Sequence, residues 1–203
     1  MSGLIQFAPR QNFTTETDFR EFLYEGEAMV RGIEGLLQKR SGRHTGWLSY
    51  TLAEREDTFP SLAAGPFPAD QDQRHEVKVV NVFELGAWKL SGTWVYASGK
   101  PYTQPAGIEP FVLPSGATAD RVVVETKNDS RLPAYHRLDL ALSREVSLGG
   151  RGRRKGSFGV TLFNLYNRRN TWYKEFNAVE GEIIENDITL MGLTVNAFVA
   201  LTF

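Results

Sequence analysis

Three histidines are the residues of this sequence best suited to acid–base catalysis or metal binding. His44, His75 and His136 are distant in the sequence, and they form neither a short-range set of metal ligands nor a Ser-His-Asp set. We interpret them as polar residues at the ends of strands. The chain has no cysteine, which excludes disulfides, thiolate metal sites and cysteine nucleophiles. The sequence therefore predicts no catalytic activity, no bound metal and no cofactor.

A run of charged residues could bind a cation through carboxylate oxygens. It comprises Asp70, Asp72, Arg74, His75 and Glu76. Hard oxygen donors of this kind suit calcium. We favour a solvated rim at the base of a loop, because the run lies beside a long connection rich in proline.

A second run is basic and resembles a patch for phosphate or nucleic acid. It comprises Arg151, Arg153, Arg154 and Lys155. Glycines punctuate this stretch, which favours a hairpin turn that meets solvent or lipid head groups. The whole chain has 23 basic and 24 acidic residues, a formal net charge of −1, so its charge does not predict nucleic acid as a partner.

Seven stretches alternate apolar with polar or small residues at period two, which predicts seven long β-strands. The predicted strands are residues 28–39, 46–54, 76–85, 88–97, 135–146, 158–166 and 188–203. The last stretch is uncharged, but Gly192, Asn196 and its many β-branched residues favour a strand over a helix. Residues 1–27 are predicted to be a loop that carries the end of an earlier strand.

The connections between these strands alternate between short and long. The short ones are residues 40–43, 86–87 and 149–156, and the long ones are 54–74, 98–133 and 167–187. Outer-membrane barrels have short periplasmic turns and long extracellular loops. The predicted fold is therefore all-β, an antiparallel meander of about seven long strands that forms part of a transmembrane β-barrel, with residues 28–203 as its C-terminal part.

The two sides of the predicted strands differ in chemistry. One side is apolar and is predicted to meet lipid in the last strand, through Leu193, Val195, Val199, Leu201 and Phe203. The other side is predicted to line a lumen, with charges at Glu34, Lys78, Arg137 and Asp139.

Aromatic residues fall near the predicted strand ends, where amphipathic rings prefer a membrane interface. They include Tyr50, Phe83, Trp94 and Tyr96. A sugar-binding platform is the alternative for Trp94 and Tyr96.

Five segments resemble the C-terminal end of the barrel of a TonB-dependent outer-membrane receptor, of the kind common in Bacteroidetes-type bacteria. They are GIEGLLQKRSGRHTGWLSYTLAERE (32–56), RHEVKVVNVFELGAWKLSGTWVYASGKPYT (74–103), LPAYHRLDLALSRE (132–145), FNLYNRRN (163–170) and GLTVNAFVALTF (192–203). The resemblance implies a bacterial outer-membrane location. It also implies active uptake of a scarce, bulky ligand such as an iron chelate, a cobalamin or an oligosaccharide.

The partners that the resemblance implies are outer-membrane lipid, the barrel-assembly machinery acting on the C-terminal strand, and the transported ligand. A plug domain and an energising periplasmic protein would act only in a full-length parent. Such transporters have about 22 strands around a plug, so we expect a fragment that does not transport alone, with any export signal upstream. The alternatives are a small outer-membrane β-barrel enzyme and a soluble β-barrel that binds a ligand.

Overall fold

The computed structural model describes residues 2–7, 23–148 and 154–202, and in this part of the chain every regular element is a β-strand. One antiparallel sheet has the order β1-β2-β3-β5-β6-β11-β12-β15, with β4 paired to β3. Its strands are β1 (Ser2–Phe7), β2 (Leu23–Lys39), β3 (His44–Thr58), β4 (Phe67–Pro68), β5 (His75–Leu85), β6 (Trp88–Ala97), β11 (Tyr135–Leu148), β12 (Arg154–Phe163) and β15 (Thr194–Thr202). The predicted all-β class and antiparallel meander are confirmed.

Three smaller two-stranded sheets lie in the long connections. They pair β7 (Pro101–Tyr102) with β10 (Ser130–Arg131), β8 (Gly107–Val112) with β9 (Thr118–Val123), and β13 (Thr171–Val179) with β14 (Glu182–Thr189). The strand count among the described residues is thus larger than the seven predicted.

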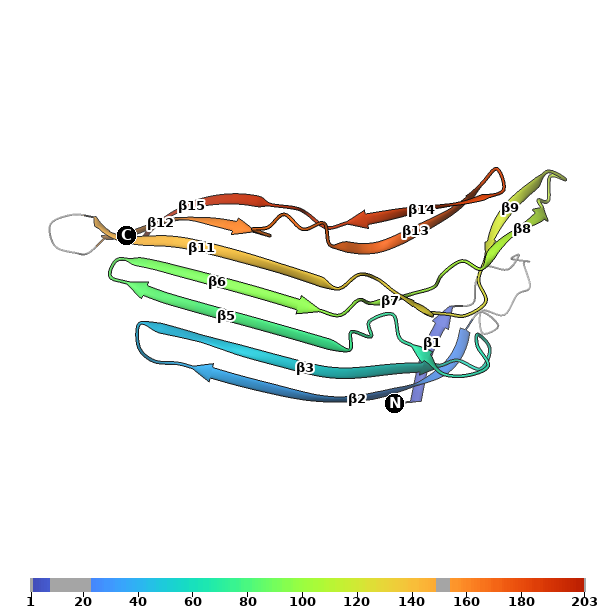
Figure 1. The fold of residues 1–203 in the computed structure, drawn as a ribbon, viewed down its shortest axis with the longest axis horizontal. Coiled ribbons are helices and arrows are strands. Elements are labelled where there is room, and N and C mark those ends of the chain that lie inside the picture. The colour runs from blue at the N-terminus through green and yellow to red at the C-terminus, as the bar shows by residue number, and fades with distance from the viewer. Residues whose placement is uncertain (1, 8–22, 149–153, 203) are drawn as a thin grey trace.

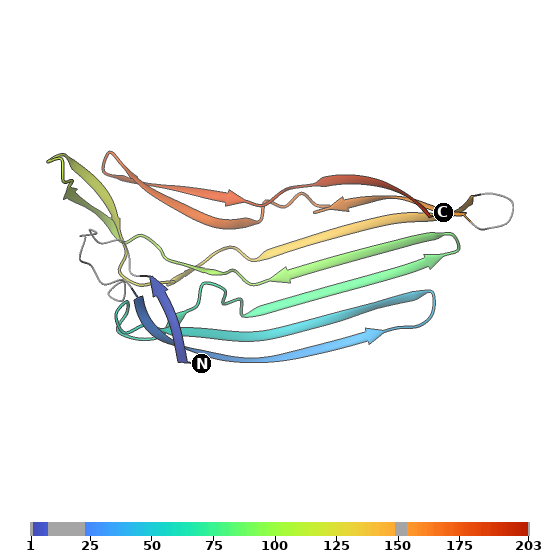
Figure 2. The same cartoon turned by 180° about the vertical axis from the view of Figure 1, so that it is seen from behind.

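The long strands lie side by side (Figures 1 and 2). Of the connections that the structure describes in full, the short ones 40–43 and 86–87 lie at one end, and the long ones after β3, β6 and β12 lie at the other. We call these the turn end and the loop end. At the turn end, the φ of Gly86 is +67° at the first position of the two-residue connection from β5 to β6. Glycine at that position suits the type II′ turn, whose twist matches that of a hairpin.

Cross-strand register places apolar residues of neighbouring strands on one side of the sheet. Leu37 lies opposite Leu48, and Leu48 opposite Val79. Val79 lies opposite Trp94, and Trp94 opposite Leu138. Directly opposed residues share a side of the sheet, so this row crosses five strands. We call this side the apolar face and the other side the polar face.

The main sheet is a single layer, and very little of the chain is buried. The accessible surface is 14648 Å², whereas a compact monomer of this mass is expected to expose about 9,600 Å². Buried apolar residues cluster towards the loop end: Ala28, Phe59, Phe67, Ala69, Ala97 and Leu132. The middle of the sheet therefore has no hydrophobic core within the described chain.

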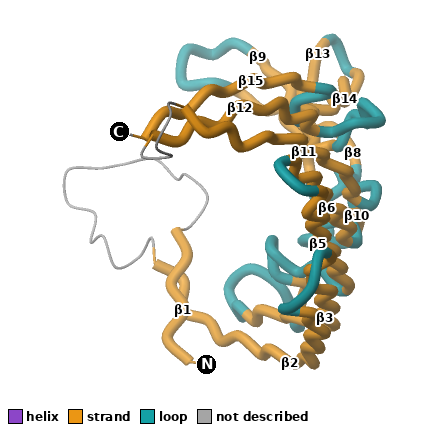
Figure 3. Tube along the Cα trace, turned by 90° about the vertical axis from the view of Figure 1, so that its left-hand side faces the viewer, coloured by secondary structure: helices purple, strands orange, loops and turns teal. Residues whose placement is uncertain are grey.

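Viewed along its strands, the sheet curves into an open arc (Figure 3). Within the described residues β1 pairs only with β2, and β15 only with β12, so the sheet is not closed.

The last predicted strand is wrong in its first part. Ile188 and Thr189 belong to β14, and β15 begins only at Thr194. The backbone N–H of Leu190 donates to the carbonyl of Asn170 at 2.8 Å, which continues the pairing of β14 with β13, and residues 190–193 form no regular element. The apolar positions change from even to odd numbers between Leu190 and Met191. The uncharged, β-branched composition of the stretch concealed this break.

Other strand boundaries also differ from the prediction. β2 begins at Leu23, inside the predicted loop 1–27, and residues 8–22 of that loop lie outside the described chain. β12 begins at Arg154, within the predicted turn 149–156, of which residues 149–153 are not described.

We predict that Gly46→Ala is destabilising whereas Gly35→Ala is not, although both residues lie on the apolar face. A Cβ on residue 46 would lie 2.2 Å from the carbonyl oxygen of Val80, and one on residue 35 would meet no atom within 4 Å. Gly46→Ala should lower the free energy of unfolding by about 1–3 kcal/mol, and Gly35→Ala should raise it by about 0.5–1 kcal/mol. Denaturant unfolding measures both, and equal effects would contradict this register.

Candidate functional site

The three histidines lie at strand ends on the apolar face, far from one another. At the loop end, His75 Nδ1 lies 2.9 Å from the hydroxyl of Tyr50, and His136 Nδ1 lies 2.9 Å from the hydroxyl of Tyr166. Each pair combines two amphipathic rings. The predicted strand-end placement is confirmed, and the rings contribute to an aromatic row at this end of the sheet.

His44 has the corresponding position at the turn end. Its ring stacks on Phe83 with the centroids 4.3 Å apart, and its Nε2 lies 2.8 Å from Oδ1 of Asn81. The imidazole thus satisfies an amide that would otherwise be an unpaired polar group on the apolar face.

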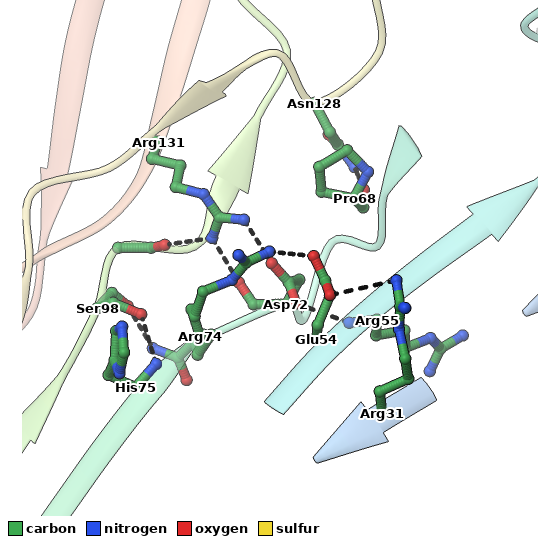
Figure 4. Close-up of polar contacts among 12 residues, drawn as sticks. Arg31, Glu54, Arg55, Pro68, Asp72, Arg74, His75, Ser98, Asn128 and Arg131 are labelled. Atoms are coloured by element: carbon green, nitrogen blue, oxygen red, sulfur yellow. Dashed lines mark hydrogen bonds and ion pairs between the residues drawn. The ribbon is translucent and has the colours of Figure 1, made fainter. Parts of the chain in front are cut away.

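Asp72 is the central residue of a polar cluster at the loop end (Figure 4). It is only 3% exposed. One carboxylate oxygen forms an ion pair with Arg131, and the other accepts from the backbone N–H of Arg55 at 2.8 Å. Arg131 also donates to the carbonyl oxygens of Asp72 and Gly99 at 3.0 and 3.1 Å. The connection after β3 is thereby joined to the connection after β6.

Two further charges of the predicted rim, Arg74 and Glu76, form ion pairs with residues outside it. Glu54 lies between Arg74, with which it forms an ion pair, and Arg31, whose Nη2 is 3.5 Å away. Glu76 Oε1 lies 2.7 Å from Lys78 Nζ. Among the described residues no three His, Asp or Glu side chains could together hold a metal ion.

Asn128 adds a second connection between the same two segments (Figure 4). Its Nδ2 donates to the carbonyl of Pro68 and to Oδ1 of Asp70, both at 2.7 Å. Its backbone N–H donates to Thr103 Oγ1 at 3.1 Å, and its φ is +57°. Asn tolerates this left-handed conformation better than most residues.

Asn164 organises the turn after β12 and is fully buried, with 0% exposure. Its Nδ2 donates to the carbonyls of Arg168 and Met191 at 2.9 and 3.0 Å, and its Oδ1 accepts from the backbone N–H of Arg168 at 3.1 Å. Its own N–H donates to Asp139 Oδ1 at 2.8 Å. One side chain thus fixes both the turn and the segment that leads into β15.

Two more asparagines of the same turn bond to backbone groups. Asn170 accepts from the N–H of His136 at 3.1 Å and donates to its carbonyl at 3.0 Å. Arg168 Nε donates to Oδ1 of Asn170 at 3.1 Å. Asn167 Oδ1 accepts from the N–H of Leu193 at 2.8 Å. The Asn residues of this turn thus bond to backbone groups of the turn itself, of β11 and of the segment before β15.

The four charged residues predicted to line a lumen all lie on the polar face by cross-strand register. They are Glu34, Lys78, Arg137 and Asp139. Arg137 Nε donates to Asp139 Oδ2 at 2.9 Å, and its guanidinium lies 4.0 Å from the ring centroid of Phe163. These charges are spread along the sheet and do not converge on one point.

The aromatic and aliphatic residues predicted to face lipid share the opposite, apolar face, apart from two residues of the last strand. Those on the apolar face are Tyr50, Phe83, Trp94, Tyr96, Val195, Val199 and Leu201. The rings of Trp94 and Tyr96 stack on each other at 6.2 Å. Leu193 lies in the connection just before β15, so its predicted strand position is wrong, and Phe203 lies outside the described residues.

A cleft of about 320 Å³ opens beside the polar cluster at the loop end. Its polar-face wall comes from Glu76, Val95, Ala97 and Tyr135, and Trp172 of β13 borders it. The volume falls at the lower end of the range for small-molecule sites. Apolar, aromatic and hydrogen-bonding groups meet here, which is a combination that can bind an uncharged polar ligand.

The hairpin of β13 and β14 carries a second set of paired charges. Lys174 forms an ion pair with Glu185, and its Nζ is 3.1 Å from Asp187. The hydrogen bond to Glu185 raises the pKa of the Lys174 ammonium, although partial burial acts in the opposite direction. Lys174 also lies over the ring of Tyr102, which stacks on Phe176. The hairpin is thereby attached to the connection after β6.

No protein-family model, curated protein or solved structure that was compared with this chain matches it. Within the described chain, no helix has the length and apolar character required to cross a bilayer.

The sequence did not identify Arg131 and Asn128 as important residues. Both lie in the 98–133 connection, far along the chain from the Asp and Pro residues that they contact. An Asn between charged residues signals a turn at most, and no local pattern gives the partner of an isolated arginine.

We predict that Asn164→Ala lowers the free energy of unfolding more than Asn167→Ala. Both residues have a φ of +53°, so the backbone strain of alanine is matched. Only Asn164 is fully buried. Its loss leaves the Met191 carbonyl and the Arg168 N–H without partners, each costing about 1–3 kcal/mol, whereas the Arg168 carbonyl keeps its hydrogen bond from the Asn170 N–H. Asn167→Ala removes one exposed hydrogen bond, worth about 1 kcal/mol. Denaturant unfolding measures the difference, and equal losses would contradict the role of Asn164.

We predict that Asp72→Asn weakens the attachment between the connections after β3 and β6. The substitution removes the negative charge that pairs with Arg131. The cost should be about 1–3 kcal/mol, since Arg131 is partly exposed and water screens it. Limited proteolysis of the 98–134 segment should become faster. Glu109→Gln breaks the exposed pair with Arg121 and serves as the control, with almost no expected change. Equal proteolysis of the two variants would show that Asp72 does not join these loops.

Proposed function

We propose that this chain forms part of the wall of a bacterial outer-membrane transport barrel of the TonB-dependent receptor kind. Its function would be the uptake of a scarce, bulky ligand such as an iron chelate, a cobalamin or an oligosaccharide. The apolar face would meet lipid, and the polar face would line the lumen.

The observation that carries this proposal is an aliphatic band between two aromatic rows on the apolar face. The loop-side row contains Tyr96 and His136, which are opposed. The turn-side row contains Trp88 and Phe158, whose rings lie 6.1 Å apart. His136 and Arg144, opposite Trp88, are separated by about 27 Å along β11. At a tilt of about 40° that length gives a band roughly 20 Å tall, close to the bands of outer-membrane barrels.

The polar face supports the lumenal half of the proposal. Its ion pair of Arg137 with Asp139 and the cleft at the loop end lie on this side. Barrel interiors of this class are polar, whereas their outer sides are apolar. A ligand entering from the loop side would meet the cleft before it reached the charged residues along the strands.

The open edges of the sheet indicate what else such a barrel needs. Each unpaired backbone group in hydrocarbon costs several kcal/mol, so β15 and the far edge of β2 require further strands. We therefore propose that this chain works with additional barrel strands, a plug domain and an energising periplasmic partner. The strand β15 would be the one that the barrel-assembly machinery contacts.

A soluble ligand-binding barrel would bury its apolar side chains around a shared interior. Val195 is 61% exposed and Val199 is 76% exposed, although both are on the apolar face. This exposure favours the membrane proposal over the soluble alternative.

We predict that an arginine substitution on β15 lowers the free energy of unfolding by an amount that depends on two things. These are the face of the sheet that the residue occupies and its depth in the bilayer. Val195 lies opposite Leu162, and Leu162 opposite Leu140, which is midway between His136 and Arg144. Val195→Arg should therefore lower the free energy of unfolding in lipid vesicles by about 2–4 kcal/mol, the cost near a bilayer midplane.

Two neighbouring positions are the controls for this prediction. Val199 lies opposite Phe158 in the turn-side aromatic row, so Val199→Arg should cost about 0–1 kcal/mol. Asn196 lies on the polar face, so Asn196→Arg should cost almost nothing. Equal costs for Val195→Arg and Asn196→Arg would show that the apolar face does not meet lipid.

A further inference from the structure

Charge is strongly asymmetric along the strand direction. Among the residues that the structure describes, the turn-end segments 38–44, 84–89, 144–148 and 154–155 contain seven Lys or Arg and two Glu, a net charge of +5. The rest of the chain contains 16 basic and 22 acidic residues, a net charge of −6. The overall charge of −1 conceals this separation, which places a cationic surface at one end of the sheet.

Six cations of the turn end, all with described side chains, form no ion pair within the described chain. They are Lys39, Arg40, Arg43, Lys89, Arg144 and Lys155. Every ion pair between described residues uses other cations, towards the loop end or in the hairpins. Their electrostatic field is therefore available to an external anion.

Arg144 connects this cationic surface to the apolar face. It lies opposite both Trp88 and Phe158, in the turn-side aromatic row. Its guanidinium is 5.2 Å from the ring centroid of Trp88. The N–H of Glu145 donates to the carbonyl of Ala87 at 3.0 Å, which keeps β11 against the β5–β6 turn. A cation held beside aromatic rings at the border of an apolar band has the position of a lipid headgroup contact.

We propose that the turn end binds anionic phospholipid headgroups, with Arg144 as the contact at the rim of the apolar face. This inference rests on the proposed membrane insertion. Anionic lipid surfaces attract nearby Lys and Arg, and each such residue raises the binding constant about fivefold. The turn end concentrates such residues, while the acidic loop end is repelled from the same lipids.

The test measures which lipid contacts Trp88. The other tryptophans are replaced by Trp47→Phe, Trp94→Phe and Trp172→Phe, and the chain is reconstituted into equimolar vesicles of phosphatidylcholine and phosphatidylglycerol. In one sample the phosphatidylcholine chains are brominated, and in the other the phosphatidylglycerol chains. Bromine quenches tryptophan fluorescence on contact, so the ratio of the two quenching values gives the local lipid preference.

Brominated phosphatidylglycerol is expected to quench Trp88 several-fold more strongly. The preference should fall by about fivefold at most with Arg144→Gln, remain with Arg144→Lys, and disappear at high salt, where the Debye length is about 3 Å. Arg121→Gln, at the loop end, is the matched charge control and should leave it unchanged. The unsubstituted chain, assayed for salt-dependent partitioning into the same vesicles, replaces the single-tryptophan variant if that variant does not fold.

The other outcomes separate the two proposals. Equal quenching by both lipids, or a preference that Arg144→Gln leaves intact, overturns this inference and leaves the proposed function standing. Quenching by neither lipid means that Trp88 meets no acyl chains, which overturns the proposed function together with the inference. If polyglutamate binds the turn end and both lipids quench Trp88 equally, the turn-end cations bind an acidic protein and not a lipid. That result also overturns the inference.

Discussion

A sheet of one layer has two uncovered faces, and this constraint governs the described chain. Its strands are regular and fully paired within the arc, yet the apolar side chains along their middle have no second layer to pack against. Burial of apolar surface normally provides the main stabilisation of a fold, at roughly 25 cal/mol per Å². The apolar face must therefore obtain an apolar environment from outside the described residues.

At the loop end, long connections are held together although few apolar groups are buried there. Polar side chains take the place of a hydrophobic core by bonding to a segment distant in the sequence, and they are Asp72, Arg131 and Asn128. Asn164 does the same between β12 and β15. Such networks are worth most when every member is satisfied, and no buried side-chain polar atom among the described residues lacks a partner. These hydrogen bonds join the segments that border the adjoining cleft.

The sequence predicted the parts of this structure that depend on the period-two alternation of apolar and polar residues. Each long strand was found, and residues as distant as Lys78 and Arg137 were assigned to one face, because alternation is local and register then follows from short turns. It failed between Ile188 and Thr194, where an uncharged and β-branched composition concealed a connection in which the apolar positions change phase. It also failed in the long connections, where β8, β9, β13 and β14 form hairpins from sequences that read as loops. The ion pair of Asp72 with Arg131 joins residues from two such connections, and no local pattern contains that information.

Two requirements of the open sheet point to the same surroundings. If lipid supplied the apolar environment alone, the outer edge of β15 would leave its N–H and C=O groups unpaired in hydrocarbon, at several kcal/mol for each group. If water surrounded the sheet, those groups would be satisfied, but the aliphatic band between the aromatic rows would remain exposed. The barrel wall that we propose would meet both requirements, because acyl chains would cover the apolar face and further strands would pair with the edges. The polar face would then enclose a lumen on the side where Arg137, Asp139 and the cleft lie.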